Sequence, residues 1–283
     1  MMFVKQSLGR SGRALILATA AVALGLSTAP STALPLPERA SAKEVAKIVK
    51  EVDLPPIVPP TGKSTIPLDQ RPFPAAALKG YEEEVPLETI QKPGNAEKYR
   101  FQLAVLDAVS TTRQLWKDDR LLVRKELVGE PTAAVKKTVS DEQVPVARAI
   151  AKLEAILEKL ESVQSKRDEQ ANRWQANFDY VLAGVLARLV YLQEYNLLLG
   201  QVRSENLPDL NPKKDQDGYR LTPAARLQSG ASIRRMGDRA QRLLDRVTKD
   251  HPFTPWAAAA KRDRAVPLGL EWVPVRLKAV RPK

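Results

Sequence analysis

The chain has 283 residues, 43% of them apolar and 5% aromatic, and this balance together with many helix-forming residues predicts an all-α protein. It contains no cysteine, which excludes disulfides, thiolate metal sites, a cysteine nucleophile and a cysteine-linked lipid anchor. The formal net charge of +12 permits attraction to nucleic acid, anionic lipid or other acidic polymers, but Lys and Arg are mixed with Asp and Glu, as is typical of a solvated surface.

Residues 1–33 have the layout of a secretory signal peptide. A basic segment up to Arg13 precedes an apolar run over 14–26, and Ser31-Thr32-Ala33 fits the small-x-small pattern of a cleavage site. Ala40-Ser41-Ala42 is a second candidate. The apolar run is shorter than the roughly 20 residues that a membrane-spanning helix needs, so cleavage is favoured over an uncleaved anchor.

We therefore expect an exported protein, located in the periplasm, the cell envelope or the extracellular space, without a transmembrane span in the mature chain. The removed segment carries three of the cations and no acidic residue, so the remaining chain would have a net charge of about +9.

Residues 34–94 are predicted to combine one short helix with a proline-rich connector. Apolar residues at helical spacing indicate an amphipathic helix over 43–52, and nine prolines follow between Leu54 and Gly94. Proline removes amide donors and restricts the residue before it, so this stretch is interpreted as an extended connector that lies on the surface or on the helical body.

The segment Thr61-Gly62-Lys63-Ser64-Thr65 in this connector resembles the end of a phosphate-binding loop. The full pattern requires a glycine where Ile57 stands, with a strand before it and a helix after it. Prolines flank the segment instead, so nucleotide binding is not predicted.

A helical domain is predicted over residues 95–275, followed by a basic tail at 276–283. Its first helix is expected from an N-cap at Asn95 to about residue 118, and residues 121–127 either continue it or form a separate turn. A short helix is expected to begin at Pro131.

The pattern then predicts a helical hairpin with arms at about 141–163 and 172–204. Ser140 is followed three residues later by a glutamine, which is the spacing of a capping box. Apolar residues alternate at intervals of three and four along both arms, but this seam fails at Arg167. One uninterrupted helix is the alternative that the pattern leaves open.

The second arm is apolar on most sides, which is typical of the central helix of a bundle. Its Tyr180, Tyr191 and Tyr195 recur at helical spacing and are interpreted as core residues in preference to a ligand pocket.

Residues 207–223 are interpreted as a loop, in which Asp217-Gly218 is a turn. The acidic residues of this loop resemble part of a calcium site, but Lys213 and Ala224 occupy the first and twelfth ligand positions, so the calcium interpretation fails.

Two helices are predicted near the C-terminus, over residues 231–250 and 255–264, the second of them capped by Thr254. The first ends in the spacing of small, apolar and proline residues that is found in the second half of a tetratricopeptide repeat. These residues are Ala240, Leu244, Val247 and Pro252.

His251, the only histidine, lies at the end of that helix, where we expect its cation to interact with the helix dipole. A catalytic histidine or a metal site needs further partner residues, and none is evident in the sequence. Glu82-Glu83-Glu84 is interpreted as a solvated charge run. We therefore predict no catalytic residue, no cofactor, no metal and no small-molecule substrate.

Four aromatic and apolar segments stand out in the second half of the chain: Arg173–Tyr180, Tyr195-Asn196, His251–Ala257 and Leu268–Trp272. Their signature residues are Trp174, Phe178, Tyr195, His251, Pro252, Pro255, Trp256 and Trp272. Over residues 60–275 the chain resembles the C-terminal region of exported bacterial proteins of uncharacterised function, some of which carry a von Willebrand factor A domain upstream. The resemblance implies export and a helical, repeat-like module. It transfers no catalytic residue, and the metal-binding Asp-x-Ser-x-Ser motif of that upstream domain is absent here.

These observations favour an exported, non-enzymatic helical protein that binds other proteins or organises an envelope assembly, because stacked helix pairs offer concave binding surfaces. The alternative is an anionic polymer or a nucleic acid as the partner of its basic surface. A hydrolase is the third possibility, with His251 as its best candidate residue.

Overall fold

The structure, a computed structural model, describes residues 38–52, 54–57, 67–82, 84–117 and 123–277. The predicted signal segment, the Thr61–Thr65 segment and Glu83 lie outside the described residues. The described residues pack as one compact unit.

The described residues are mostly helical, which confirms the all-α class, with one small sheet in addition. The helices are α1 (Ala42–Val52), α2 (Ala75–Leu78), α3 (Leu87–Ile90), α4 (Arg100–Lys117), α5 (Ala133–Val163), α6 (Asn172–Arg203), α7 (Ala231–Asp250) and α8 (Pro255–Arg264). The strands are β1 (Glu126–Val128), β2 (Gly218–Ala224) and β3 (Gly269–Val275). Short 3₁₀ turns occupy Leu68–Gln70, Pro93–Asn95, Gln164–Glu169 and Pro212–Lys214.

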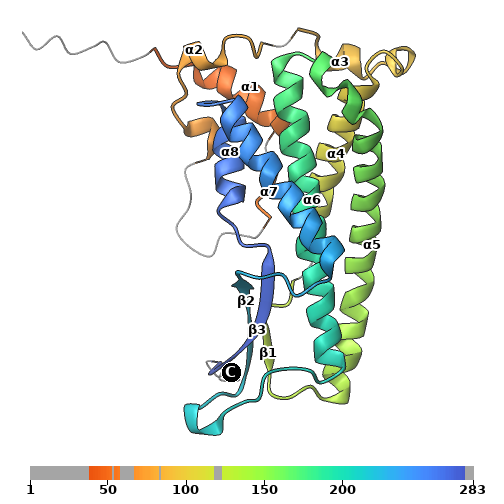
Figure 1. Ribbon diagram of the computed structural model, residues 1–283, viewed down its shortest axis with the longest axis vertical. Helices are drawn as coiled ribbons and strands as arrows, with labels where there is room; N and C mark the ends of the chain where they lie inside the picture. The colour runs from red at the N-terminus through yellow and green to blue at the C-terminus, as the bar shows by residue number, and fades with distance from the viewer. Residues whose placement is uncertain (1–37, 53, 58–66, 83, 118–122, 278–283) are drawn as a thin grey trace, which may run out of the picture. The chain divides into compact units, whose positions relative to one another are not determined.

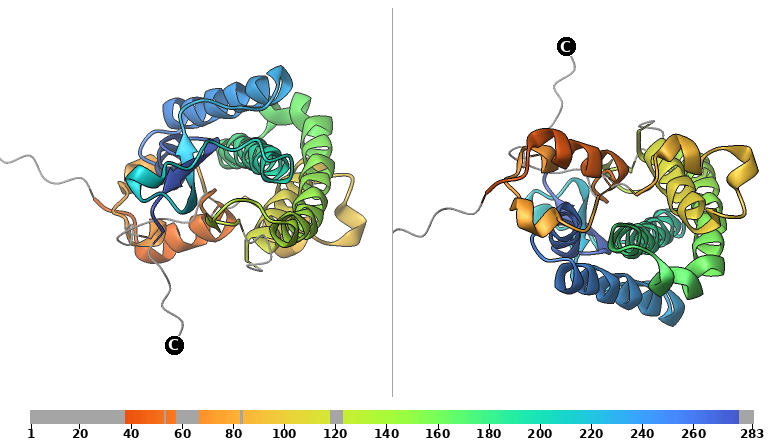
Figure 2. Two further views of the ribbon diagram at one scale, coloured as in Figure 1. Left: turned by 90° about the horizontal axis from the view of Figure 1, so that it is seen from below. Right: turned by 90° about the horizontal axis from the view of Figure 1, so that it is seen from above.

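Helices α5 and α6 form the predicted hairpin, and the single long helix is excluded (Figure 1). The polar segment around Arg167 becomes a 3₁₀ turn that reverses the chain. At the other end of the hairpin, the Gln143 side chain donates to Asn196 Oδ1 at 3.0 Å. Helix α6 is central, with α4, α5 and α7 around it, and every residue from Ala176 to Leu192 is buried (Figure 2).

Helix α5 begins eight residues earlier than the capping-box spacing predicted, so the prediction of an N-cap at Ser140 is wrong. The N-cap is Thr132, whose hydroxyl accepts the amide of Val135 at 3.3 Å. Ser140 lies inside the helix and donates to the Lys136 carbonyl at 3.0 Å. The reason is packing, because the completely buried Val139 continues the apolar stripe upstream of Ser140.

The first helix of the predicted domain begins later than expected. Asn95 ends a 3₁₀ turn and donates its side-chain amide to the Thr89 carbonyl at 2.8 Å, while α4 begins at Arg100. Asn95 is therefore not the N-cap. Residues 126–128 form strand β1, so the prediction of a helical or turn continuation over 121–127 is wrong for its described end.

The three strands form an antiparallel sheet in the order β1-β2-β3, which the sequence did not predict. The predicted loop 207–223 contains most of β2, and Gly218 pairs with Val128 on one side and Val275 on the other. The interpretation of Asp217-Gly218 as a simple turn is therefore wrong. Prolines within β2 and β3 hide the strand pattern, and the pairing joins segments that are distant in the chain.

The sheet is joined to the helical body by Trp272 on β3, whose indole Nε1 donates to the Leu198 carbonyl of α6 at 3.2 Å. Only 3% of Trp272 is exposed, which agrees with its interpretation as a packing residue.

Helix α1 matches the predicted amphipathic helix, and the described part of the proline-rich segment packs on the helical body. This segment contains short helical turns and is not uniformly extended. Its buried apolar side chains are Leu54, Ile57, Leu68, Phe73, Leu78, Tyr81 and Ile90. Upstream of α1, the amide of Ala40 donates to the Phe73 carbonyl at 2.8 Å, so residues 38–41 belong to the same packed unit.

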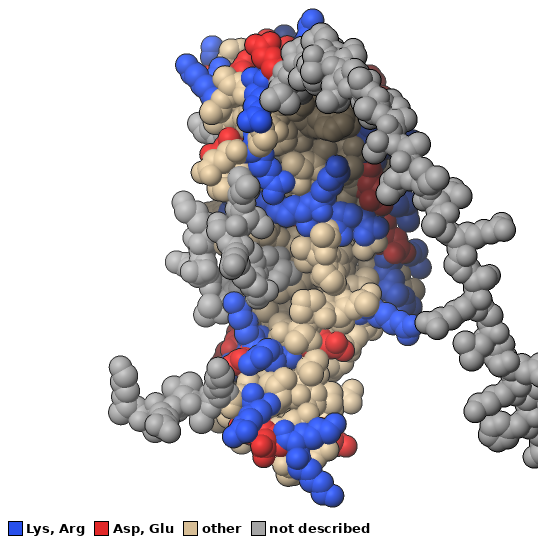
Figure 3. Space-filling model, turned by 90° about the vertical axis from the view of Figure 1, so that its left-hand side faces the viewer, with Lys and Arg blue, Asp and Glu red and all other residues tan. Residues whose placement is uncertain are grey.

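Helices α7 and α8 have the predicted bounds, and the Thr254 hydroxyl caps α8 by accepting the Ala257 amide at 3.3 Å. The two helices are rich in cations, with nine Lys or Arg against four Asp or Glu. Figure 3 shows Lys and Arg side chains gathered across the face that carries α8. No helix in the described ranges has both the length and the apolar character needed to cross a bilayer.

We predict that Gly218→Ala destabilises the fold by about 1–3 kcal/mol, because a Cβ at this position would lie 2.4 Å from the Leu127 carbonyl oxygen and 2.5 Å from Leu277 Cδ1. Gly200→Ala in α6 is the matched control: its Cβ would meet nothing within 4 Å and should stabilise the helix by up to about 1 kcal/mol. Urea unfolding of both variants measures the difference, and equal stability of the two would contradict the close packing of β2.

Candidate functional site

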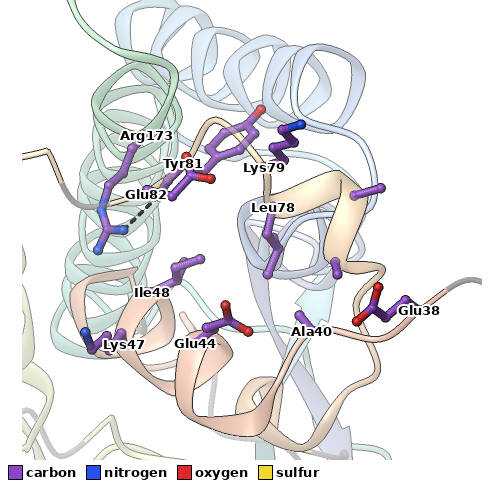
Figure 4. A pocket seen from close by; sticks show the side chains of 12 residues that line it. Glu38, Ala40, Glu44, Lys47, Ile48, Leu78, Lys79, Tyr81, Glu82 and Arg173 are labelled. Carbon is purple, nitrogen blue, oxygen red and sulfur yellow. Dashed lines mark hydrogen bonds between the residues drawn. The ribbon is translucent and has the colours of Figure 1, made fainter.

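An open groove of about 520 Å³ lies between α1, the segment 75–82 and the first turn of α6 (Figure 4). Its apolar lining includes the buried side chains of Ile48, Leu78 and Tyr81. Among the described residues its charged lining is balanced in sign: Glu38, Glu44, Glu82, Lys47, Lys79 and Arg173.

Two of the groove carboxylates serve local structure. Glu44 accepts from the amide and the hydroxyl of Ser41 at 2.9 and 2.7 Å, and the Ser41 hydroxyl accepts the Glu44 amide at 3.2 Å. This is a capping box at the start of α1, and its hydrogen bonds lower the pKa of Glu44. Glu82 accepts the amide of Gly80 at 2.7 Å. Neither carboxylate has the buried, apolar surroundings that keep a general acid protonated at neutral pH.

Arg173 connects the segment 75–82 to α6. It is 5% exposed, and its Nη1 donates to the Tyr81 carbonyl at 2.8 Å (Figure 4). The groove wall is thus attached to the central helix by this arginine.

Behind the groove, Tyr81 packs in a buried aromatic cluster with His251 and Trp256. Its hydroxyl lies 2.8 Å from His251 Nδ1, and its ring packs at 5.2 Å from that of Trp256. The Trp256 indole in turn donates to Asn177 Oδ1 of α6 at 2.8 Å. Tyr81, from the proline-rich segment, is therefore the contact between the groove and the α7–α8 turn.

His251 is 3% exposed, and burial lowers its pKa. The prediction that a His251 cation interacts with the helix dipole is therefore wrong, because the ring lies away from water, where the neutral form is favoured. Its Nε2 makes no hydrogen bond within the described part of the chain.

A buried ion-pair cluster joins α6 to its neighbours close to this site. Asp179 has no exposed surface, and it pairs with Arg167 of the 3₁₀ turn at 2.7 Å and with Arg246 of α7. Arg167 interrupts the apolar seam of the hairpin in the sequence. In the structure it attaches the turn to α6 through this ion pair, and only 15% of its side chain is exposed.

A second buried polar cluster joins α6 to α8 and to the segment after α1. Tyr180 donates to Asp263 at 2.8 Å, and Arg262 donates to the Tyr180 oxygen at 3.1 Å. Arg188 lies 5.1 Å above the Trp116 ring and donates to the Pro55 carbonyl. Burial raises the pKa of Tyr180 and lowers that of Arg188. Tyr180, Tyr191 and Tyr195 are all buried, in line with their interpretation as core residues.

The eight signature residues do not form one site. His251, Pro252, Pro255 and Trp256 share the α7–α8 turn, with Pro252 exposed and the other three buried. Phe178 is buried within α6 beside Phe101, whereas Trp174 is half-buried. Tyr195 accepts the Arg124 amide at 2.8 Å, and Trp272 lies on β3, so these two belong to the sheet end of the molecule.

Sequence reasoning missed Tyr81, which connects the groove to the α7–α8 turn, and the pair of Asp179 and Arg246, which joins α6 to α7. Tyr81 carries no motif, and Asp179 is a lone acid in an apolar helix. The one available signal was that an uncompensated charge at a core position requires a partner. The acidic run at 82–84 is only partly at the groove: Glu82 lines it, and Glu84 is exposed.

Among the described residues, no group of three or more metal-binding side chains comes together. Comparison with protein-family models, curated proteins and solved structures finds no match to this chain. The resemblance to exported bacterial proteins stays a prediction.

We predict that stability falls as the pH is lowered from 7.5 to 5.5, by at most about 1.4 kcal/mol per pH unit. The pKa of His251 is lower in the folded chain than its ordinary value of 6.5, so the unfolded chain binds the proton first. Urea unfolding at both pH values measures the effect against His251→Gln, which cannot ionise. Because the chain has one histidine, an identical pH dependence in the two proteins would contradict a neutral buried His251.

We predict that Asp179→Asn destabilises the fold by about 3 kcal/mol, because Arg167, whose side chain is 15% exposed, loses its buried charge partner. The loss at Arg246 adds little, because 41% of that side chain is exposed to water. Asp168→Asn is the matched control: Asp168 pairs with the same Arg167, but its side chain is 88% exposed, so its loss should have little effect. Thermal unfolding compares the two, and a mild Asp179→Asn phenotype would show that the cluster is dispensable.

Proposed function

We propose that this chain is an exported, non-enzymatic helical protein that binds another protein through the groove between α1, the segment 75–82 and α6. The observation that carries the proposal is the groove itself, which is open, has an apolar floor and has a rim with charges of both signs. Protein interfaces combine a buried apolar centre with a polar rim in the same way.

The chemistry of the lining favours binding over catalysis. Among the described residues that line the groove there is no histidine, and the hydroxyl group is the phenol of Tyr81, whose oxygen is hydrogen-bonded to His251. Burial raises the pKa of Tyr81, which makes its phenolate harder to form. With Glu44 and Glu82 engaged by backbone amides, the hydroxyl and base that the described residues place together here are those of Tyr81 and His251, and this pair is buried behind the groove.

If the chain is exported and processed, the fold distinguishes between the two candidate cleavage sites. Cleavage after Ala33 would leave every described residue in place. Cleavage after Ala42 would remove the Ala40 hydrogen bond to Phe73 and the Ser41 capping box of α1. The first site is therefore compatible with the folded chain.

The α7–α8 pair supports the repeat-like part of the proposal. Ala240, Leu244 and Val247 are buried where α7 packs against its neighbours, as the tetratricopeptide spacing requires. Pro255 begins α8 directly after the turn.

The alternative is an anionic polymer at the basic face of α7 and α8, favoured by their excess of cations (Figure 3). Part of this charge is already compensated within the chain, because Arg239 pairs with Glu161, Arg246 with Asp179 and Arg264 with Asp245. A polyanion would bind with an affinity that falls steeply with salt, whereas a groove-bound protein would be retained at high salt.

We predict that chemical crosslinking and affinity purification from the exporting cell recover a protein partner with the native chain and lose it with Ala76→Trp. Ala76 is an exposed residue of the groove, so a tryptophan there should fill the groove and leave the core unchanged. Ala151→Trp, at an exposed position of α5, is the matched control and should retain the partner. Equal recovery with both variants, or no partner at any salt concentration, would overturn the proposal.

A further inference from the structure

The turn between α7 and α8 contains a phenylalanine whose side chain is exposed to solvent. Phe253 is 72% exposed, among the most exposed large apolar side chains of the described residues, and its φ is +60°. At this position of a turn, after a proline, glycine or asparagine is the usual residue, because a side chain with a Cβ is strained there. A bulky apolar residue in this conformation is unfavourable both for backbone strain and for solvation.

The exposure of Phe253 is built into the fold. On one side His251 is buried, and on the other Thr254 is 1% exposed, with its hydroxyl donating to the His251 carbonyl at 2.6 Å. Both ends of the turn are therefore fixed, and the residue between them is presented outward. Strain of this kind, maintained by rigid surroundings, is concentrated at functional positions.

Phe253 belongs to the same region as the groove. Tyr81 lines the groove, and its hydroxyl is bonded to His251, two residues before Phe253. One chain thus carries an exposed apolar side chain and an apolar-floored groove, and the turn that presents the first is hydrogen-bonded to the wall of the second. This is the arrangement that a two-fold interface requires, since each copy must supply the surface that the other binds.

We propose that the partner is a second copy of this chain, with Phe253 of each copy inserted into the groove of the other. The proposal rests on the function proposed above and names the occupant of its groove. Among the described residues the groove has three acidic and three basic side chains, and exposed Lys249 and Asp250 lie just before the turn, so two copies can meet without like charges predominating among these groups. The same balance disfavours an anionic membrane as the occupant.

The test is analytical ultracentrifugation of the processed protein over a range of concentrations, with Phe253→Gly as the main variant. We expect the native chain to dimerise, and the variant to dimerise at least about tenfold more weakly, as for a central aromatic contact. Its Tm should be equal to or above that of the native chain, because glycine relieves the left-handed strain. Val128→Ala is the matched control, since Val128 is 74% exposed but lies on β1, and it should dimerise normally.

Mixing provides the second readout. Phe253→Gly retains the groove, and Ala76→Trp retains the projection, so a mixture of the two restores one of the two contacts and should associate more tightly than either variant alone. A native chain that stays monomeric, or a Phe253→Gly variant that dimerises as tightly as the native chain, overturns the inference. If Phe253→Gly fails to dimerise but still captures a different protein through the groove, the proposed function is supported separately from the dimer. If Ala76→Trp changes neither dimerisation nor partner capture, both the proposed function and the dimer are contradicted.

Discussion

The buried carboxylate of Asp179 is the constraint on which the arrangement of the helices depends. It lies on the central helix and pairs with two arginines from different elements. Arg167 comes from the turn that reverses the hairpin, and Arg246 comes from α7. Away from water such an interaction is strong only while all its members are in place, and an unpaired member is costly. The cluster therefore fixes where α7 crosses α6, and hence where the turn after α7 lies.

The groove follows from this placement. His251, at the end of α7, can reach Tyr81 only because α7 is held against α6, and Tyr81 in turn positions the segment that closes one side of the groove. Arg173 fixes the same segment from the central helix. The groove is thus a product of contacts between three parts of the chain that are far apart in sequence, and its rigidity suits the docking of a partner without a large ordering cost.

The sequence predicted those features that local patterns encode. The bounds of α7 and α8 and the cap at Thr254 follow from side chains that interact within one turn of each other, and the hairpin follows from the apolar spacing on both sides of Arg167. Where a local capping signal and the apolar pattern predicted different helix starts, packing determined the outcome. The capping-box spacing predicted a start at Ser140, but the helix begins upstream because the apolar stripe continues through Val139. Likewise, the side chain of Asn95 donates a hydrogen bond to the Thr89 carbonyl and does not cap α4.

By itself the sequence determined the helical class and the central position of α6, because periodicity and composition are properties of the chain alone. The absence of cysteine also excluded disulfides and thiolate chemistry. The sheet, the burial of His251 that lowers its pKa, the partners of Asp179 and the groove at Tyr81 were decided only by tertiary structure. Each depends on residues that are not neighbours in the chain, from 12 positions apart for Arg167 and Asp179 to 170 for Tyr81 and His251, and their pairing arises when the burial of α6 brings the segments together and removes the water between them.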